Sequence, residues 1–524
     1  MEILRKNVHM SRQKNRAVSQ ITLDNDFNVP DIKPDIDKLI LDRGEIRIED
    51  VHPEKDRVSL KGFLMAGILY ASAGPEAKIQ GMEGKLPFEE TLHMDGIERG
   101  DNLKIDWEME DLSVSAINSR KISVRSIITF TASAEEIYDE ELSCGLEDAA
   151  DVQIRTGEEE ILKLMLNKKD TFRIREEVLL ASNQANIYEL LWKDMKLQGV
   201  EVRLMEDQIS IKGELAVFAL YEGENEAQVQ WVSSTIPFAG TVDVSGCRAE
   251  MIGDIRVQAV SADLEAKPDY DGEERTMQAD VVLKLDIRLY QEEKVQILRD
   301  LYSLSEQLKL LRQKVKLDTL LMKNYSKARF HERIPIRQEG LSILQICHSS
   351  GRVVVEETER IPEGLKVEGI VLVEILYITT NDRIPVCRAV GEVPFTHVLE
   401  VPGMDETCIH SLQAELEQIT AAMVDSREAE IRVMIDFNLL VHRPLLCENI
   451  LEIQEEPQNY EALQQLPGIV GYIVGNDDGL WDIAKKYYTT VEKICETNHL
   501  TGEQVKPGEK LLVIKSVGTG KMTG

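Results

Sequence analysis

Residues 58–64 read VSLKGFL, and two later stretches repeat the pattern: ISIKGEL at 209–215 and LKVEGIV at 365–371. In each copy apolar side chains alternate with polar ones, the period of a β-strand that buries one face. The same position of each copy is a glycine: Gly62, Gly213 and Gly369. A glycine inside a strand marks a bulge or a close approach of another group to the backbone. The glycines are 151 and 156 positions apart, by subtraction of their numbers, so the repeating unit has the size of a domain.

Other landmarks keep register with the glycines. A Leu-Tyr pair follows each glycine, a Pro-Phe pair lies further on, and an arginine then opens another alternating strand. These residues are Tyr70, Tyr221 and Tyr377; Phe88, Phe238 and Phe395; Arg120, Arg275 and Arg427. Strands separated by turn-rich acidic loops favour antiparallel sheets packed as a sandwich. We interpret the recurrent arginines as structural partners of carboxylates rather than as binding residues.

Two segments between the repeats have the spacing of helices. Residues 158–166 lie between the first and second repeats, and residues 301–322 lie between the second and third. In the latter, Leu304, Leu308 and Leu311 fall on one helical face. We expect these segments to be helices packed on the adjacent domain, with dimerisation helices as the alternative. The predicted organisation is a first repeat at 1–145, a second at 146–300 and a third at 301–456, the last two with helical linkers.

The C-terminal stretch has a different pattern. Leu480, Ile483, Ala484 and Tyr487 recur at i, i+3, i+4 and i+7, which predicts a helix. A shorter helix follows from Val491, and we expect Thr489 and Glu492 to cap its start. Apolar runs at 472–474 and 511–514 flank the helices, the second just after the turn pair Pro507-Gly508. The order strand, helix, helix, strand therefore predicts a small module at 467–517.

This stretch resembles a LysM domain. The matching positions are Tyr472, Val474, Asp478, Leu480, Trp481, Ile483, Ala484, Tyr487, Thr490, Val491, Ile494, Asn498, Leu500, Pro507, Gly508 and Leu511. The resemblance implies a shallow groove for N-acetylglucosamine-containing glycans, formed here by Asp478, Gly479, Leu480, Asn498, His499 and Leu500. Two positions depart from the family: Asp477 replaces the usual Gly, and Gly479 replaces the usual Thr or Ser. Trp481 is expected to supply core area beside the first helix.

The changed loop favours a groove adapted to protein recognition. A small groove needs a central apolar anchor with a polar rim to bind a protein. Leu480 and Leu500 are the expected anchors. Lys485, Lys486 and His499 are the expected rim.

The repeats resemble the SPOCS repeats of spore-coat-associated proteins from anaerobic spore formers. The likeness rests on residues 28–35 (NVPDIKPD), Lys61-Gly62, Leu69-Tyr70, Pro87-Phe88 and Asn118-Ser119-Arg120. Three such repeats followed by one LysM domain are similar to the SipL type of spore morphogenetic protein. The resemblance implies a role in the mother-cell cytoplasm, where the protein would tether the coat to the forespore surface by binding SpoIVA, the coat basement-layer ATPase. The expected fold class is mainly β, with three antiparallel β-sandwich-like repeats and a small β-α-α-β LysM domain.

Charge limits the possible partners. The formal net charge is -32, which disfavours nucleic acid and anionic lipid surfaces. Residues 467–517 hold seven acids and six lysines, a net of -1, so the remaining residues carry -32 minus -1, or -31. The N-terminus lacks the apolar core of a signal peptide and no run is long enough to span a membrane, so we expect a cytoplasmic chain. The seven cysteines are widely spread without a C-x-x-C pair, which argues against disulfides and zinc.

No motif indicates catalysis. The sequence has no phosphate loop, no His-Glu-x-x-His pair and no Gly-x-Ser-x-Gly elbow. We therefore expect no catalytic residues, no metal site and no cofactor. The leading hypothesis is a non-enzymatic assembly adaptor. The alternative is a peptidoglycan-binding protein that recognises N-acetylglucosamine glycans, and a hydrolase is a third class without a supporting motif.

Overall fold

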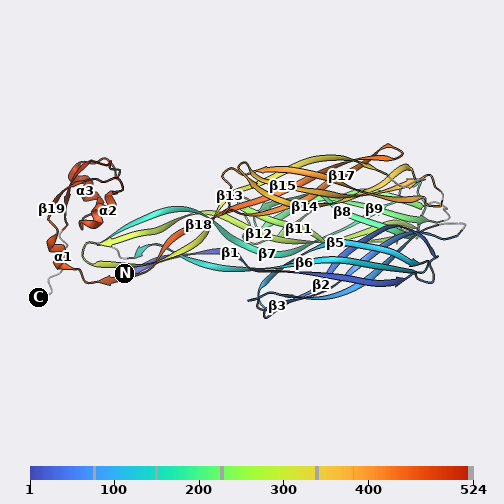
Figure 1. Ribbon diagram of the computed structural model, residues 1–524, viewed down its shortest axis with the longest axis horizontal. Helices are drawn as coiled ribbons and strands as arrows, with labels where there is room; N and C mark the ends of the chain where they lie inside the picture. The colour runs from blue at the N-terminus through green and yellow to red at the C-terminus, as the bar shows by residue number, and fades with distance from the viewer. Residues whose placement is uncertain (75–77, 148–150, 225–228, 337–340, 382, 517–524) are drawn as a thin grey trace.

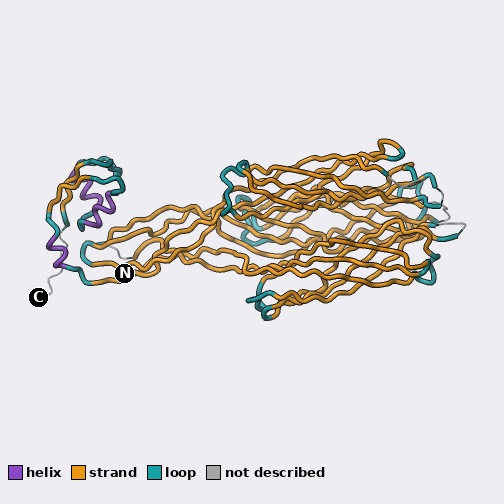
Figure 2. The backbone as a smooth tube through the Cα atoms, in the orientation of Figure 1, coloured by secondary structure: helices purple, strands orange, loops and turns teal. Residues whose placement is uncertain are grey.

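The computed structural model has an elongated shape with three parts (Figure 1). It describes residues 1–74, 78–147, 151–224, 229–336, 341–381 and 383–516. A wide body of long strands narrows into a stalk, and the stalk ends at a small helix-containing tip (Figure 2). The N-terminus lies in the stalk, near the tip. We call residues 467–516 the C-terminal module.

The strands fall into three groups of six. The first group is β1 (Glu2–Asn28), β2 (Ile36–Glu54), β3 (Arg57–Ser72), β4 (Ile79–His93), β5 (Asn102–Asn118) and β6 (Lys121–Glu147). The second is β7 (Val152–Leu179), β8 (Ile187–Met205), β9 (Gln208–Gly223), β10 (Val229–Asp243), β11 (Ile252–Pro268) and β12 (Glu274–Ser303). The third is β13 (Gln307–Pro335), β14 (Ile343–Ile361), β15 (Gly364–Thr379), β16 (Val386–Glu400), β17 (Ile409–Asp425) and β18 (Glu428–Glu456).

Each group forms two antiparallel three-stranded sheets. In the first repeat their orders are β2-β3-β4 and β1-β6-β5, and the other repeats have the same topology. Apolar side chains from both sheets share one core; in the first repeat these include Leu60, Leu64, Ile122 and Phe130. The expected mainly β fold, built of antiparallel sandwich-like repeats, is confirmed.

The recurrent glycines are places of close approach. Gly62, Gly213 and Gly369 are paired across the strands with Phe88, Phe238 and Phe395. A Cβ on Gly369 would lie 2.2 Å from the backbone oxygen of Val354 and 2.9 Å from the Phe395 ring. The phenylalanine covers the bare glycine backbone, which explains why the two landmarks recur together.

The recurrent tyrosines, together with Arg120 and Arg275, hold the loops at the far end of the body. Tyr70, Tyr221 and Tyr377 are fully buried, and each hydroxyl donates to a loop carbonyl, as Tyr70 does to Pro34 at 3.0 Å. The Arg120 guanidinium donates to the carbonyls of Val29, Pro30 and Lys33, and Arg275 makes the same kind of contact with its own loop. Arg120 and Arg275 are therefore structural, as expected, but their partners are mainly backbone carbonyls.

The three repeats pack against one another around a common core. Leu41 and Leu69 of the first repeat, Trp192 and Leu220 of the second and Leu376 of the third belong to one buried cluster. In the stalk, each repeat contributes the outer halves of two long strands. A second shared cluster lies between them, formed by Val8, Met10, Leu142, Ile161, Val295, Ile297, Val315, Leu317 and Cys447.

The prediction of helical linkers at 158–166 and 301–322 is wrong. Residues 158–166 lie in β7, and residues 301–322 span the end of β12 and the first half of β13. Leu308 and Leu310 alternate as in a strand, and a bulge between Leu311 and Arg312 then shifts the alternation before Val315. A strand with a bulge no longer alternates strictly, so its leucines can fall at intervals that resemble those of a helix. The conformation of this segment is set instead by its pairing with β18.

The C-terminal module has the expected order of elements. A short helix α1 (Tyr460–Gln465) leads to β19 (Ile469–Ile473), α2 (Leu480–Lys486), α3 (Val491–Asn498) and β20 (Lys510–Ile514). Strands β19 and β20 pair antiparallel. The sequence pattern did not indicate helix α1.

Candidate functional site

The core of the C-terminal module comes from the helical stripe seen in the sequence. Leu480, Ile483 and Ala484 of α2 are buried with Ile494 of α3 and Leu511 of β20. The side chain of Thr490 caps α3 by accepting a hydrogen bond from the amide of Lys493 at 3.2 Å. The expected cap, Thr489, is instead fully buried. The helix therefore starts one residue later than the Thr-x-x-Glu spacing indicated.

The loop before α2 is held by Asp478. Its carboxylate accepts hydrogen bonds from the Tyr472 hydroxyl at 2.6 Å and from the amide of Gly475 at 2.7 Å. The hydrogen bond from Tyr472 lowers the pKa of Asp478. The same bond raises the pKa of Tyr472 to about 12. Asp478 therefore fixes the loop, and Gly479 caps α2 with its backbone alone.

The second expected loop is tied to β20. The Asn498 amide donates to the carbonyls of Ile494 and Leu512 and accepts from the amide of Leu512 at 2.7 Å. His499 ends α3 in the left-handed conformation, with φ of 54°. Leu500 borders a cavity of about 430 Å³ whose other walls are Thr501, Gly502, Gln504, Lys506 and Glu509. No hydrogen bond among the described residues joins this loop to Asp478–Leu480.

Two of the expected contact residues serve other purposes. Leu480 is 2% exposed, so its side chain belongs to the core and cannot act as an anchor for a partner. Lys485 donates to both carboxylate oxygens of Asp300 in the stalk, each at 2.8 Å. The prediction that Leu480 is an anchor is therefore wrong, because its side chain is packed in the core. Lys485 stays a predicted rim residue, and its ammonium is paired with Asp300.

The module docks on the end of β12. The Trp481 indole donates to Asp300 at 2.9 Å, and its ring meets Tyr302 edge-on with centroids 4.9 Å apart. The Tyr302 hydroxyl donates to the buried carbonyl of Thr489 at 2.8 Å. Tyr302 is itself part of the module's core cluster. No local pattern marked Asp300 or Tyr302, because they lie about 180 positions before their partners in the chain.

Docking through α2 leaves the sheet of the module facing away from the stalk (Figure 1). On that outer face Ile469 is 63% exposed, Ile473 is 65% exposed and Leu512 is 44% exposed. Leu512 lies opposite Gly471 in the strand pairing, midway between the two isoleucines. We call Ile469, Ile473 and Leu512 the aliphatic strip. Exposed apolar groups gathered on one small face are typical of an interaction surface.

The described residues offer no metal centre. They contain no group of three or more His, Cys, Asp or Glu side chains placed to hold a metal ion. In the same part of the chain, no helix is long and apolar enough to cross a membrane.

Two family models match the chain. The model described as SipL, SPOCS domain matches three times, at residues 35–117, 186–268 and 342–424. Each match spans four strands of one repeat, β2 to β5 in the first, so the strands that build the stalk lie outside the matched ranges. The model described as LysM domain matches residues 472–513.

Neither of the other comparisons adds a relative. No curated protein matches the chain, and no solved structure matches it. The two family models describe binding domains rather than catalytic ones. The chain thus has the domain architecture of the SipL type, with three SPOCS domains followed by one LysM domain.

Proposed function

We propose that the protein is a non-enzymatic assembly adaptor in spore coat morphogenesis. Its partner would be a SpoIVA-like ATPase of the coat basement layer, at the forespore surface in the mother-cell cytoplasm. The SipL-type domain architecture supports the sporulation role. The observation that carries the binding role is the aliphatic strip, because it is an uncovered apolar face on the outermost element of the molecule.

The LysM domain would bind its protein partner with this sheet face. The three aliphatic side chains would supply the apolar centre that a small protein interface needs. The docked stalk supports the other side of the domain through Asp300 and Tyr302, so the strip is presented at a fixed end of a long, stiff body. This arrangement suits a tether that spans two layers.

The experiment is capture of a SpoIVA-like partner by the full-length chain and by two variants, Ile473→Lys and Leu512→Lys. Both positions are exposed, so the variants are expected to fold while capture falls at least tenfold. Leu344→Lys is the matched control, because Leu344 is a 58% exposed aliphatic residue of the third repeat, outside the LysM domain. Undiminished capture by both strip variants would refute the strip as the binding face.

The alternative function is recognition of N-acetylglucosamine glycans. The LysM match favours it, and so does the cavity beside Leu500, whose walls include a hydroxyl, an amide and a carboxylate at Thr501, Gln504 and Glu509. Polar groups of this kind hydrogen-bond sugar hydroxyls. The residues Asp478, Gly479, Leu480, Asn498, His499 and Leu500 would surround the glycan in this reading, with Leu480 contributing its backbone only.

A further inference from the structure

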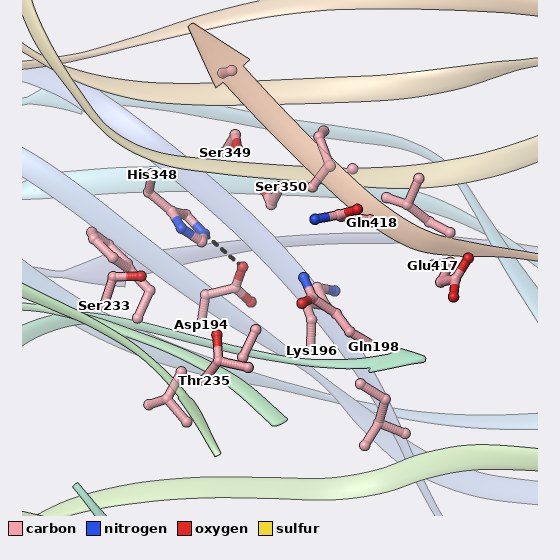
Figure 3. A pocket seen from close by; sticks show the side chains of 18 of the residues that line it. Asp194, Lys196, Gln198, Ser233, Thr235, His348, Ser349, Ser350, Glu417 and Gln418 are labelled. Atoms are coloured by element: carbon pink, nitrogen blue, oxygen red, sulfur yellow. Dashed lines mark hydrogen bonds and ion pairs between the residues drawn. The ribbon is translucent and has the colours of Figure 1, made fainter. Parts of the chain in front are cut away.

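A cavity of about 390 Å³ lies between the second and third repeats. Its walls come from β8, β9 and β10 of the second repeat and from β14 and β17 of the third. In Figure 3 the side chains of Lys196 and Gln198 extend from β8 toward Gln418 of β17. His348 and Asp194 close one end through a hydrogen bond of 2.8 Å. The volume falls within the range of small-molecule sites.

Short side chains in the second repeat create the space. Strand register makes Ala216 equivalent to Met65 of the first repeat and to Leu372 of the third. On the neighbouring strand β10, two further residues of the second repeat are shorter than their equivalents. Ser233 corresponds to Glu83 and Val390, and Thr235 corresponds to Lys85 and Glu392. The second repeat therefore carries a small residue at three adjacent positions where the other repeats carry larger ones.

At the other two junctions between repeats, an arginine at the equivalent place contacts the neighbouring repeat. Arg47 of the first repeat reaches Asp263 of the second at 3.5 Å. Arg352 of the third repeat reaches the carbonyl of Met109 of the first at 3.5 Å. Lys196 occupies the position equivalent to Arg352, yet its ammonium has no hydrogen bond or ion pair with any described residue. The cation at this junction is left available.

The polar groups around Lys196 are similarly unused. The side chains of Gln198, Ser233, Thr235, Ser349, Ser350 and Gln418 line the cavity, and none of them hydrogen-bonds another described residue. By contrast, the Asp194 carboxylate is neutralised by Arg43 at 2.9 Å and hydrogen-bonded by His348. The other carboxylate in the wall, Glu417, is paired with Lys327. The wall therefore holds two carboxylates with cationic partners, and one ammonium, that of Lys196, among several hydroxyls and amides.

We propose that this cavity binds a small, polyhydroxylated monoanion of the sugar-acid class. The carboxylate of the ligand pairs with the Lys196 ammonium, and its hydroxyls exchange hydrogen bonds with the serine, threonine and glutamine side chains. Ala216 and Leu416 supply the apolar part of the wall against the carbon skeleton. The site is independent of the LysM domain and of its protein partner.

The test is calorimetric titration of the full-length protein with sodium glucuronate, and with glucose as the uncharged counterpart of the same size. Glucuronate is expected to bind at least tenfold more tightly than glucose. Lys196→Gln, at an exposed position, is expected to remove this preference without affecting the fold. Ala216→Leu places in the second repeat the residue that the third repeat has, and is expected to abolish binding by filling the cavity.

Glu392→Thr is the matched control, since it shortens the equivalent side chain of the third repeat, outside the cavity. This variant is expected to bind glucuronate as the parent does. Absence of heat with glucuronate would overturn the proposal. Equal binding of glucose, or unchanged selectivity in Lys196→Gln, would overturn it as well.

Discussion

At the residue scale, the recurrent glycines, phenylalanines and tyrosines each have a separate structural role. Each glycine lets a neighbouring backbone approach, each phenylalanine covers that glycine, and each tyrosine pins a loop by its hydroxyl. Burial raises the pKa of both Tyr70 and Tyr377 to about 12, so these hydroxyls stay protonated and keep donating across the physiological range. The sequence signature of the repeat is therefore a signature of its packing.

The glycine position gives the first prediction. Gly369→Ala places a methyl group where a Cβ would lie 2.2 Å from the Val354 oxygen, so the strands must separate. Overpacking of this kind costs about 1 to 3 kcal/mol, and the midpoint of urea unfolding should fall. Gly145→Ala is the control, because its Cβ would meet only Leu4, at 3.6 Å. Equal midpoints for the two variants would show that the close approach is not needed.

Asp300 gives a pH prediction. Burial alone would raise the pKa of Asp300, but hydrogen bonds from Lys485 and Trp481 outweigh it, so the pKa lies below the ordinary value of 3.8. A lowered pKa means that docking is favoured above the ordinary pKa and is lost as the pH falls through the lower one. The distribution of distances between one spin label on the stalk and another on the LysM domain should be narrow at neutral pH and broaden below about pH 4.

Asp300→Asn is expected to broaden the same distance distribution at every pH, because Lys485 loses its charged partner. Asp24→Asn is the control and should behave like the parent, because the exposed carboxylate of Asp24 has no hydrogen bond or ion pair among the described residues. A distance in Asp300→Asn that matches the parent from acid to neutral pH would contradict the role given to Asp300.

At the element scale, periodicity predicted what depends on local sequence. The alternation around Gly62 and the helical stripe from Leu480 each depend on neighbours a few residues away, and both elements exist as expected. The helices predicted around Glu158 and Leu308 do not form, because pairing with β12 and β18, more than 130 residues later, sets the conformation of these segments. Bulges in these long strands also disturb the period of two.

The candidate site divides in the same way. The fold of the LysM domain and the structural departure at Gly479 could be read from the sequence. The burial of Leu480 follows from its place on the helical stripe, so the sequence also contained the evidence against using it as an anchor. The contacts of Trp481 with Asp300 and Tyr302 could not be predicted, because they depend on how the domain sits on the stalk.

Docking predicts that the LysM domain gains stability from the stalk. Trp481→Ala removes a partly buried ring that contacts both the domain core and Tyr302. Aromatic-to-alanine changes in cores cost about 3 to 5 kcal/mol, and we expect the low end here. Tyr302→Phe leaves the buried Thr489 carbonyl without its donor, which costs about 1 to 3 kcal/mol.

Hydrogen exchange of the amides in α2 and α3 measures both effects in the full-length chain. Faster exchange than in the parent is expected for each variant, with the larger change for Trp481→Ala. Phe63→Leu, a change in the distant first repeat, serves as the control. Parental exchange rates in Tyr302→Phe would mean that the domain does not depend on the stalk.

At the scale of the whole molecule, ion pairs between charged residues join the three repeats in a fixed arrangement. Arg43 of the first repeat and His348 of the third both contact Asp194 of the second, while Arg388 of the third contacts Asp42 of the first at 2.8 Å. Burial would raise the pKa of Asp194, but the hydrogen bond from His348 and the charge of Arg43 lower it well below its usual range. A different pair of side chains joins each two repeats, so one repeat could not replace another in the assembly.

Asp194→Ala should therefore weaken the association of all three repeats. Removing one partner of a buried ion pair costs about 3 to 5 kcal/mol, and the low end applies because the Arg43 side chain is 30% exposed. The thermal unfolding transition should fall in temperature and broaden as the repeats unfold less cooperatively. Arg203→Gln, which removes an exposed pair with Glu201, is the control and should leave the transition unchanged.

We propose that the LysM domain at the end of the stalk recognises a protein and not a glycan. The most direct measurement is calorimetric titration of the full-length chain with chitin oligomers, beside capture of a SpoIVA-like partner from a purified mixture. The same pair of measurements is made on the double variant Asp477→Gly, Gly479→Thr, which restores the usual loop and should keep the fold, because a Cβ on Gly479 would meet only the flexible end of Asp482 at 3.2 Å. For the parent we expect no detectable heat with chitin oligomers and full capture of the partner. For the double variant we expect parental capture, because Asp477 and Gly479 lie outside the aliphatic strip. Tight binding of chitin oligomers by the parent, in competition with the partner, would contradict recognition of a protein by this domain.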